Sequence, residues 1–454
     1  MQELIQSLQG RQYDLVFIDH IENKGYSSAF SFEDLVLGTS ELPLSEVAVN
    51  LDHNLSEHKA IAVDLDTLSL IKKNGCFKPP SSMLIVSNEI PQHAGNASDL
   101  LSDDDIANYL ENLPPNALFV DKFEITIDVK PKALKRLERS LIALEAEGYC
   151  VERKEVSNPL AVKYRYQIEI SGKDKQGHAL RDKIIILTHG YSENINDVKA
   201  AFNPSKLSHT GPCLFDVLAC FRASTPNTFK ELMKTSNVTR IDYTIDLVNV
   251  QVWQLIFILS NSQYSQTYVD THGNIETRIE GTKNLYIKAY NLANDRSKKA
   301  IAYGDMNRAQ HFRNLPPIVR IEVTLRPQKM GTVDNPSFGH LPQFPHPFGP
   351  IKFFNPNKLF EQPELSGKYP QVVLLGLHSL MRHTSDNAQY NRIRRQSNKA
   401  VVNLSDSIVA DQQICHKSLK ALFLTNDIKK FSKYCKQLSS HVTNNKHITG
   451  ADYV

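Results

Sequence analysis

Several features that mark membrane and secreted proteins are missing from this sequence of 454 residues. Its apolar runs, such as 184–187 and 252–259, are far shorter than the roughly 20 residues that a membrane-spanning helix needs. The N-terminus has no basic flank ahead of an apolar stretch, so we expect no secretory signal. The six cysteines form no C-x-x-C pair, which is typical of reduced thiols in a cytosolic protein. We therefore expect a cytoplasmic protein with no membrane partner.

The whole chain has a net charge of only +3, but its two parts have net charges of opposite sign, because the first has few basic residues. Residues 1–115 contain 18 Asp/Glu and 6 Lys/Arg, whereas residues 116–454 contain 31 Asp/Glu and 46 Lys/Arg. Opposite net charges favour a body that binds a polyanion, joined to an acidic N-terminal accessory region. The alternative is that most of these charges are solvated surface. Pro114 and Pro115 follow the acidic cluster 103–105 and predict a boundary near residue 115.

Strand and helix patterns are mixed along the chain, and its length predicts two or three domains. We expect an α+β fold in which an antiparallel or mixed sheet is flanked by helices. Predicted strands are 123–129, 164–170, 183–189, 238–246, 267–270, 275–279, 284–290 and 319–326. Predicted helices follow Pro131 and cover 253–259. The main domain would span 116–326, a Pro-rich connecting loop 327–360, and a basic helical C-terminal region 361–454.

Three of the predicted strands place polar residues at every second position, and residues of one parity share a face of a strand. If the strands pair, carboxylates, cations and a phenol converge on one surface. A sheet with one solvated face would also alternate, and that is the structural alternative. The polar positions are Arg240, Asp242, Thr244 and Asp246; Asn284, Tyr286, Lys288 and Tyr290; and Arg320, Glu322, Thr324 and Arg326.

These residue types suit phosphodiester transfer. Two or three carboxylates are suitable ligands for a hard divalent cation such as Mg²⁺ or Mn²⁺. A tyrosine is a nucleophile that can hold a covalent phosphoester, and a lysine beside it offsets negative charge. The pattern therefore predicts a metal-dependent tyrosine nuclease.

The same strings resemble the rolling-circle replication initiators of filamentous bacteriophages and the related Rep-trans plasmid initiators. The resemblance rests on 240–246, 285–288 and 320–326 in that order, together with the Phe-Asn-Pro-Ser-Lys string at 202–206, and it covers roughly 118–400. It implies a catalytic replication-initiator domain at 116–326. Such a protein binds the double-stranded origin, nicks one strand and stays attached to the 5′-phosphate through tyrosine. It later rejoins the displaced single strand, in the cytoplasm of a bacterial host and with a host helicase or polymerase as a possible partner.

Carried over residue by residue, the resemblance makes Tyr286 the nucleophile, with Lys288 beside it and Tyr290 as the rival or second nucleophile. Asp242 and Glu322 would bind the metal, with Asp246 as a further candidate. Many wider relatives bind metal through a His-hydrophobic-His pair, which this chain lacks, so we expect a carboxylate-rich site.

A second group of residues is predicted to contact DNA through phosphate, with a solvated surface as the alternative. It comprises Arg240, Arg320, Arg296, Lys298, Lys299, Arg392, Arg394 and Arg395. Two other functions stay open: a DNA-binding regulator that keeps the fold without chemistry, and a relaxase or transposase that uses the same tyrosine chemistry. The sequence does not indicate the oligomeric state.

Overall fold

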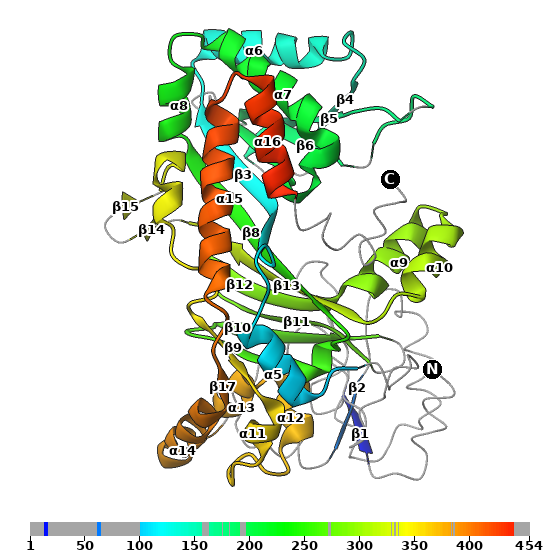
Figure 1. Ribbon diagram of the computed structural model, residues 1–454, viewed down its shortest axis with the longest axis vertical. Helices are drawn as coiled ribbons and strands as arrows, with labels where there is room; N and C mark the ends of the chain where they lie inside the picture. Colours follow the sequence, from blue (N-terminus) through cyan, green and yellow to red (C-terminus); the bar gives the residue numbers. More distant parts are fainter. Residues whose placement is uncertain are drawn as a thin grey trace, which may run out of the picture.

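The fold is dominated by one sheet of ten strands, all of them antiparallel, in a computed structural model of the chain (Figure 1). The structure describes residues 13–16, 61–64 and 100–439, with gaps at 157–162, 175, 181, 191–196, 271–273, 328, 331–332, 335, 383 and 385. Most of the acidic region 1–115 therefore lies outside the described residues. The α+β prediction, a large antiparallel sheet flanked by helices, is confirmed.

The order across the large sheet is β10-β11-β12-β13-β8-β3-β7-β6-β5-β4. In chain order its strands are β3 (Phe119–Asp128), β4 (Cys150–Glu155), β5 (Tyr164–Ser171), β6 (Ile184–Gly190), β7 (Asp197–Phe202), β8 (Asn237–Val248), β10 (Tyr264–Val269), β11 (Ile275–Gly281), β12 (Leu285–Asn291) and β13 (Ile318–Leu325). Smaller sheets pair β1 (Tyr13–Val16) with β2 (Ile61–Asp64), β14 (Lys329–Met330) with β15 (Val333–Asp334), and β16 (Ile351–Phe354) with both β9 (Ile256–Leu259) and β17 (Val401–Val402).

Helices flank the large sheet. They are α5 (Asp103–Glu111), α6 (Pro131–Ala143), α7 (Leu207–Ser224), α8 (Phe229–Thr235), α9 (Leu292–Ala302), α10 (Met306–Arg313), α11 (Pro356–Phe360), α12 (Tyr369–Leu375), α13 (Leu377–Arg382), α14 (Asn387–Ser397), α15 (Ser407–Leu424) and α16 (Ile428–Leu438), with short 3-10 turns η2 (Pro204–Lys206), η3 (Val252–Gln254), η4 (Phe338–Gln343) and η5 (Asn398–Ala400). Of these, α7, α8 and α15 contribute buried residues to the core on the apolar face of the sheet. In Figure 1, α6, α7, α8, α15 and α16 gather at one end, whereas α9 and α10 project on the other side.

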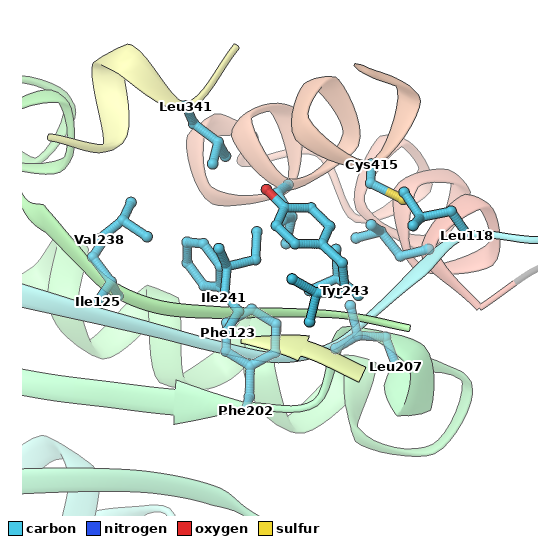
Figure 2. Close-up of a cluster of buried hydrophobic side chains, with 14 of the residues drawn as sticks. Leu118, Phe123, Ile125, Phe202, Leu207, Val238, Ile241, Tyr243, Leu341 and Cys415 are labelled. Carbon is cyan, nitrogen blue, oxygen red and sulfur yellow. The ribbon is translucent and has the colours of Figure 1, made fainter. Parts of the chain in front are cut away.

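The core forms because every second residue of the alternating strands is apolar, and these residues pack together on one face of the sheet. Ile241 and Tyr243 of β8 are fully buried and point toward Leu341 of η4 and Cys415 of α15 (Figure 2). The Tyr243 hydroxyl meets His416 Nε2 at 2.6 Å, which satisfies the one polar atom that this tyrosine brings into the core. The alternate residues of β8, which include Asp242 and Thr244, therefore point to the opposite face of the sheet.

The ten strands form two halves of the same topology. We call β3–β7 the first half and β8 with β10–β13 the second half. In each half the first strand pairs with the last, and the remaining strands follow in reverse chain order. The two halves meet through the antiparallel pair β3–β8, so an approximate twofold relation passes between them. Their opening strands carry similar strings, Lys-Phe-Glu-Ile-Thr-Ile-Asp at 122–128 and Arg-Ile-Asp-Tyr-Thr-Ile-Asp at 240–246.

Several segments differ from expectation. The predicted helix 253–259 is wrong: η3 is followed by the strand β9. A short apolar run has the same pattern in a buried strand as in a buried helix. The range 327–360, expected as a connecting loop, contains η4, β16 and α11. The helix α5 precedes residue 115 but packs into the main body through the buried Ile106 and Leu110.

Candidate active site

The predicted site residues lie in three cross-strand rows on the polar face of the second half. The pairing of β12, β13 and β8 aligns Tyr286 with Thr324 and Asp242, Lys288 with Glu322 and Thr244, and Tyr290 with Arg320 and Asp246. Residues directly opposite one another in antiparallel strands have Cβ atoms about 5 Å apart. The register therefore brings the phenols, the lysine and the carboxylates together, as the alternation predicted.

Asp242 is held tightly within the first row. Its side chain is 2% exposed, and both of its oxygens accept hydrogen bonds from Arg240, at 2.8 and 2.7 Å. Thr324 Oγ1 also donates to Asp242, at 2.8 Å. Burial lowers the pKa of Arg240, but the hydrogen bond and charge of Asp242 outweigh it and raise that pKa. Arg240 Nη2 in turn lies 3.4 Å from Tyr286 Oη, which connects the carboxylate to the phenol.

Asp246 forms a second ion pair at the other end of the site. Arg320 donates to its two oxygens at 2.7 and 2.8 Å, and both side chains are almost fully buried. Arg320 Nη1 also approaches Asp121 Oδ2, at 3.7 Å. Burial lowers the pKa of Arg320, but these carboxylates raise it well above its ordinary value. The guanidinium therefore keeps its charge and is an obligatory partner of Asp246.

Asp121 is a site residue that the sequence pattern missed. It lies at a bulge in β3, where the pairing with β8 shifts, so it falls outside the strand alternation. Asn203 Nδ2 and Ser205 Oγ donate to Asp121 Oδ1, at 3.0 and 3.1 Å. Both donors belong to the Phe-Asn-Pro-Ser-Lys string at 202–206, which therefore fixes a carboxylate beside the second-half site.

Glu322 differs from the other carboxylates of the site. No hydrogen bond or ion pair reaches it from any residue that the structure describes. Burial raises the pKa of Glu322 to about 7, and the negative charge of Asp121 adds to this effect. A carboxylate whose pKa is strongly raised by burial and by a neighbouring charge is a marker of functional sites.

The two candidate nucleophiles have different surroundings. Tyr290 is 8% exposed, burial raises its pKa, and the Lys288 ammonium lies 4.1 Å from the centre of its ring. Tyr286 is only half-buried, beside Arg240 and with the Arg326 guanidinium 5.8 Å from its ring centre. A nucleophile must be reached by its substrate, and the greater exposure of Tyr286 meets this requirement better than the nearly buried Tyr290 does.

The predicted DNA contacts fall into three places. Arg240 and Arg320 lie inside the site, in the ion pairs already described. Arg296 of α9 also faces it, where burial and the charge of Arg320 lower its pKa. Lys298 and Lys299 are exposed on α9 and pair with Glu276 and Asp295, at 2.5 and 2.7 Å. All three residues belong to α9, which begins directly after β12.

The remaining predicted cations are far from the site. Arg392, Arg394 and Arg395 lie on the exposed side of α14, away from α9 in Figure 1. Arg392 pairs with Glu364 at 2.7 Å. Lys206 is a further cation near the site, and it was not among the predicted DNA contacts. Burial lowers the pKa of Lys206, and the nearby charges of Arg296 and Arg320 lower it further.

The carboxylates fit a divalent cation only in part. Among the described residues, no group of three or more His, Cys, Asp and Glu side chains is arranged to hold a metal ion. The oxygens of Asp242 and Asp246 are bonded to arginines, whereas Glu322 has no such partner and Asp121 lies near it. Oxygen-only ligands of this kind match Mg²⁺ or Mn²⁺. His189 lies in the first half, where its Nε2 is 3.4 Å from Glu138 Oε2.

Comparison with known proteins does not assign the chain to a family. No protein-family model matches the chain, and no curated protein matches it. None of the helices in the part of the chain that the structure describes is long and apolar enough to cross a membrane.

Proposed function

We propose that the chain is a replication initiator that nicks double-stranded origin DNA through Tyr286 and rejoins strands in rolling-circle replication of a phage or plasmid. The observation that supports this most is the register of β12, β13 and β8. It places a half-buried tyrosine, a lysine and an unpaired glutamate on one face, with arginines on both sides. Alternation alone does not require such residues to be neighbours.

In this proposal the phenol oxygen of Tyr286 attacks the scissile phosphorus and the 3′-oxygen of the preceding nucleotide leaves. Arg240 lies beside the phenol oxygen, where its charge stabilises the negative charge of the scissile phosphate during the attack. Glu322 has a pKa of about 7, so near neutral pH it is able to accept the phenol proton or return one to the leaving oxygen. Lys288 lies directly opposite Glu322 and offsets charge on the transferred phosphoryl group.

A divalent cation would be held by Glu322 and Asp121, with Asp242 available if Arg240 moves to the phosphate; Glu322 would then act as a ligand and not as the proton acceptor. When bound, it would polarise the phosphoryl oxygens. Tyr290 is placed as a second nucleophile only if its surroundings open, because it is nearly buried.

The ion pairs also favour a second candidate function. Arg240 and Arg320 neutralise Asp242 and Asp246 within the protein, which is what a DNA-binding regulator without chemistry would retain. Such a regulator would bind duplex DNA and form no covalent adduct.

One experiment separates the two functions. The purified protein is incubated with supercoiled origin plasmid and Mg²⁺, and DNA-linked peptides are mapped by mass spectrometry. We expect a 5′-phosphotyrosyl adduct at Tyr286, abolished by Tyr286→Phe with DNA binding and thermal unfolding unchanged. Tyr290→Phe is the matched control and should keep the first cleavage. Duplex binding with no adduct would support the regulator, and an adduct at Tyr290 would move the nucleophile.

A further inference from the structure

A second tyrosine lies next to Tyr286 on the edge of the sheet. The first row of the site extends past β12 onto two further strands, because Tyr286 pairs with Gly281 and Gly281 pairs with Tyr264. The row therefore reads Tyr264, Gly281, Tyr286, Thr324 and Asp242 across five strands. Tyr264 begins the edge strand β10, and its side chain is 37% exposed.

Gly281 is what lets the two phenols meet. A Cβ atom at this position would lie 2.4 Å from Tyr286 Cβ and 2.6 Å from Tyr264 Oη, too close for any side chain. The glycine does not have a positive φ, so the backbone does not require it. Its role is to leave space: the Tyr264 phenol lies over the bare backbone of β11 and reaches the base of Tyr286. The charge of Tyr286 adds to the burial that raises the pKa of Tyr264, as expected for adjoining phenols.

A cation completes this group of residues. Arg326, exposed after the end of β13, lies 5.8 Å from the Tyr286 ring centre, and its charge also acts on Tyr264. An exposed aromatic ring beside a guanidinium is the combination that binds single-stranded nucleic acid, because the ring stacks on a base and the cation contacts phosphate. Both side chains are exposed, and neither belongs to the hydrophobic core.

We propose that Tyr264, Gly281 and Arg326 form a subsite for one unpaired nucleobase next to the scissile phosphate. The inference rests on the proposed function, since it takes Tyr286 as the attacking group. An intact duplex stacks its bases on one another, so this subsite selects DNA that is single-stranded or melted at the nick. In this proposal Tyr264 distinguishes single-stranded from double-stranded DNA, and Tyr286 carries out the cleavage.

The test measures binding in a Tyr286→Phe background, where no cleavage occurs. The probes are a fluorescent 12-residue oligo-dT and a 12-residue oligomer of abasic deoxyribose phosphate, which has the same charge but no bases. Tyr264→Ala should weaken oligo-dT binding about fivefold or more, the effect of losing one stacked base, and leave the abasic oligomer unaffected. Tyr264→Phe keeps the ring and should retain the affinity.

Two further variants sharpen the test. Gly281→Ala should displace the Tyr264 ring and weaken oligo-dT binding alone, with thermal unfolding checked in parallel. Tyr303→Ala removes a tyrosine that is 74% exposed elsewhere and should change nothing. Equal losses on the two oligomers, unchanged oligo-dT binding in Tyr264→Ala, or no binding of oligo-dT at all would overturn the subsite. A selective loss without any covalent adduct in the otherwise native protein would keep the subsite and refute the nicking function.

Discussion

The two halves of the sheet have one topology but differ in whether their buried glutamates are paired. In the first half, Glu124 pairs with Lys122 and Lys199, and Glu169 pairs with Lys154 and Lys183. Burial alone would raise the pKa of Glu169, but the hydrogen bonds from these lysines lower it to about 2. In the second half, Glu322 has a pKa of about 7. The first half satisfies these charges, whereas the second half retains two carboxylates with raised pKa values, Glu322 and the fully buried Glu280 of β11, whose pKa is also about 7.

The difference arises at a few corresponding positions. The registers place Ile185 where the second half has Tyr286, Leu187 where it has Lys288, and Lys199 where it has Glu322. The order and pairing of the strands are otherwise the same in the two halves. Unfavourable electrostatics that persist in one copy of a scaffold and are absent from the other indicate where function was selected, because a purely structural sheet has no reason to keep them.

The largest expected effect concerns catalysis. Glu322→Gln and Asp242→Asn remove a charge at nearly constant shape, and each should lower the rate of adduct formation by about 10²–10³-fold, as the loss of one preorganised electrostatic group does. Duplex binding should persist, because phosphate contacts supply most of that affinity. The rate is followed by gel quantification of the protein–DNA adduct.

The corresponding first-half variants are the controls. Lys199→Gln occupies the position of Glu322, and Glu124→Gln that of Asp242, and neither should alter the rate. If the variants in the two halves lowered the rate of adduct formation equally, the functional distinction between the halves would be wrong.

The next effect concerns stability. Asp246→Ala leaves the buried Arg320 without its main partner, which should cost about 3 kcal/mol in the free energy of unfolding. Asp128 is the corresponding first-half residue and is exposed, so Asp128→Ala should cost less than about 0.5 kcal/mol. Urea unfolding of both variants measures the difference. Similar costs would mean that the Asp246–Arg320 pair does not organise the second half.

The smallest effect concerns pH. Unfolded glutamate titrates near 4.5 and folded Glu322 near 7, so between these values the folded protein holds a proton that the unfolded chain has lost. The Glu322 contribution to the free energy of unfolding therefore falls as pH rises from about 4.5 to about 7 and is flat above. Glu322→Gln should be more stable than the native protein by about 1–2 kcal/mol at pH 8, with a smaller gain at pH 5.

Glu169 supplies the opposite sign. Its folded pKa of about 2 lies below the unfolded value, so its stabilisation is present above about pH 4.5 and is lost as pH falls toward 2. Glu169→Gln should therefore destabilise the protein at pH 7 and have little effect near pH 2. Urea midpoints across this range test both variants. A pH-independent effect of Glu322→Gln would show that its carboxyl titrates normally.

The sequence by itself determined the faces of the strands. Alternation in β8, β12 and β13 is a local property, and it separated Asp242, Tyr286 and Glu322 from the buried parity before any pairing was known. Even the repeat between 122–128 and 240–246 is visible in the letters, although its meaning depends on topology. Local patterns did not decide 253–259, because a short apolar run suits a strand as well as a helix.

Only the tertiary structure decided which polar residues are neighbours. Register is set by contacts between segments far apart in the chain, so no local pattern could place Tyr286 opposite Thr324 or Gly281 between two tyrosines. Asp121 escaped prediction because a bulge interrupts the alternation on which the prediction depended. The raised pKa of Glu322 likewise depends on burial and on Asp121, which is 201 residues away in the chain and becomes its neighbour only when the sheet has formed.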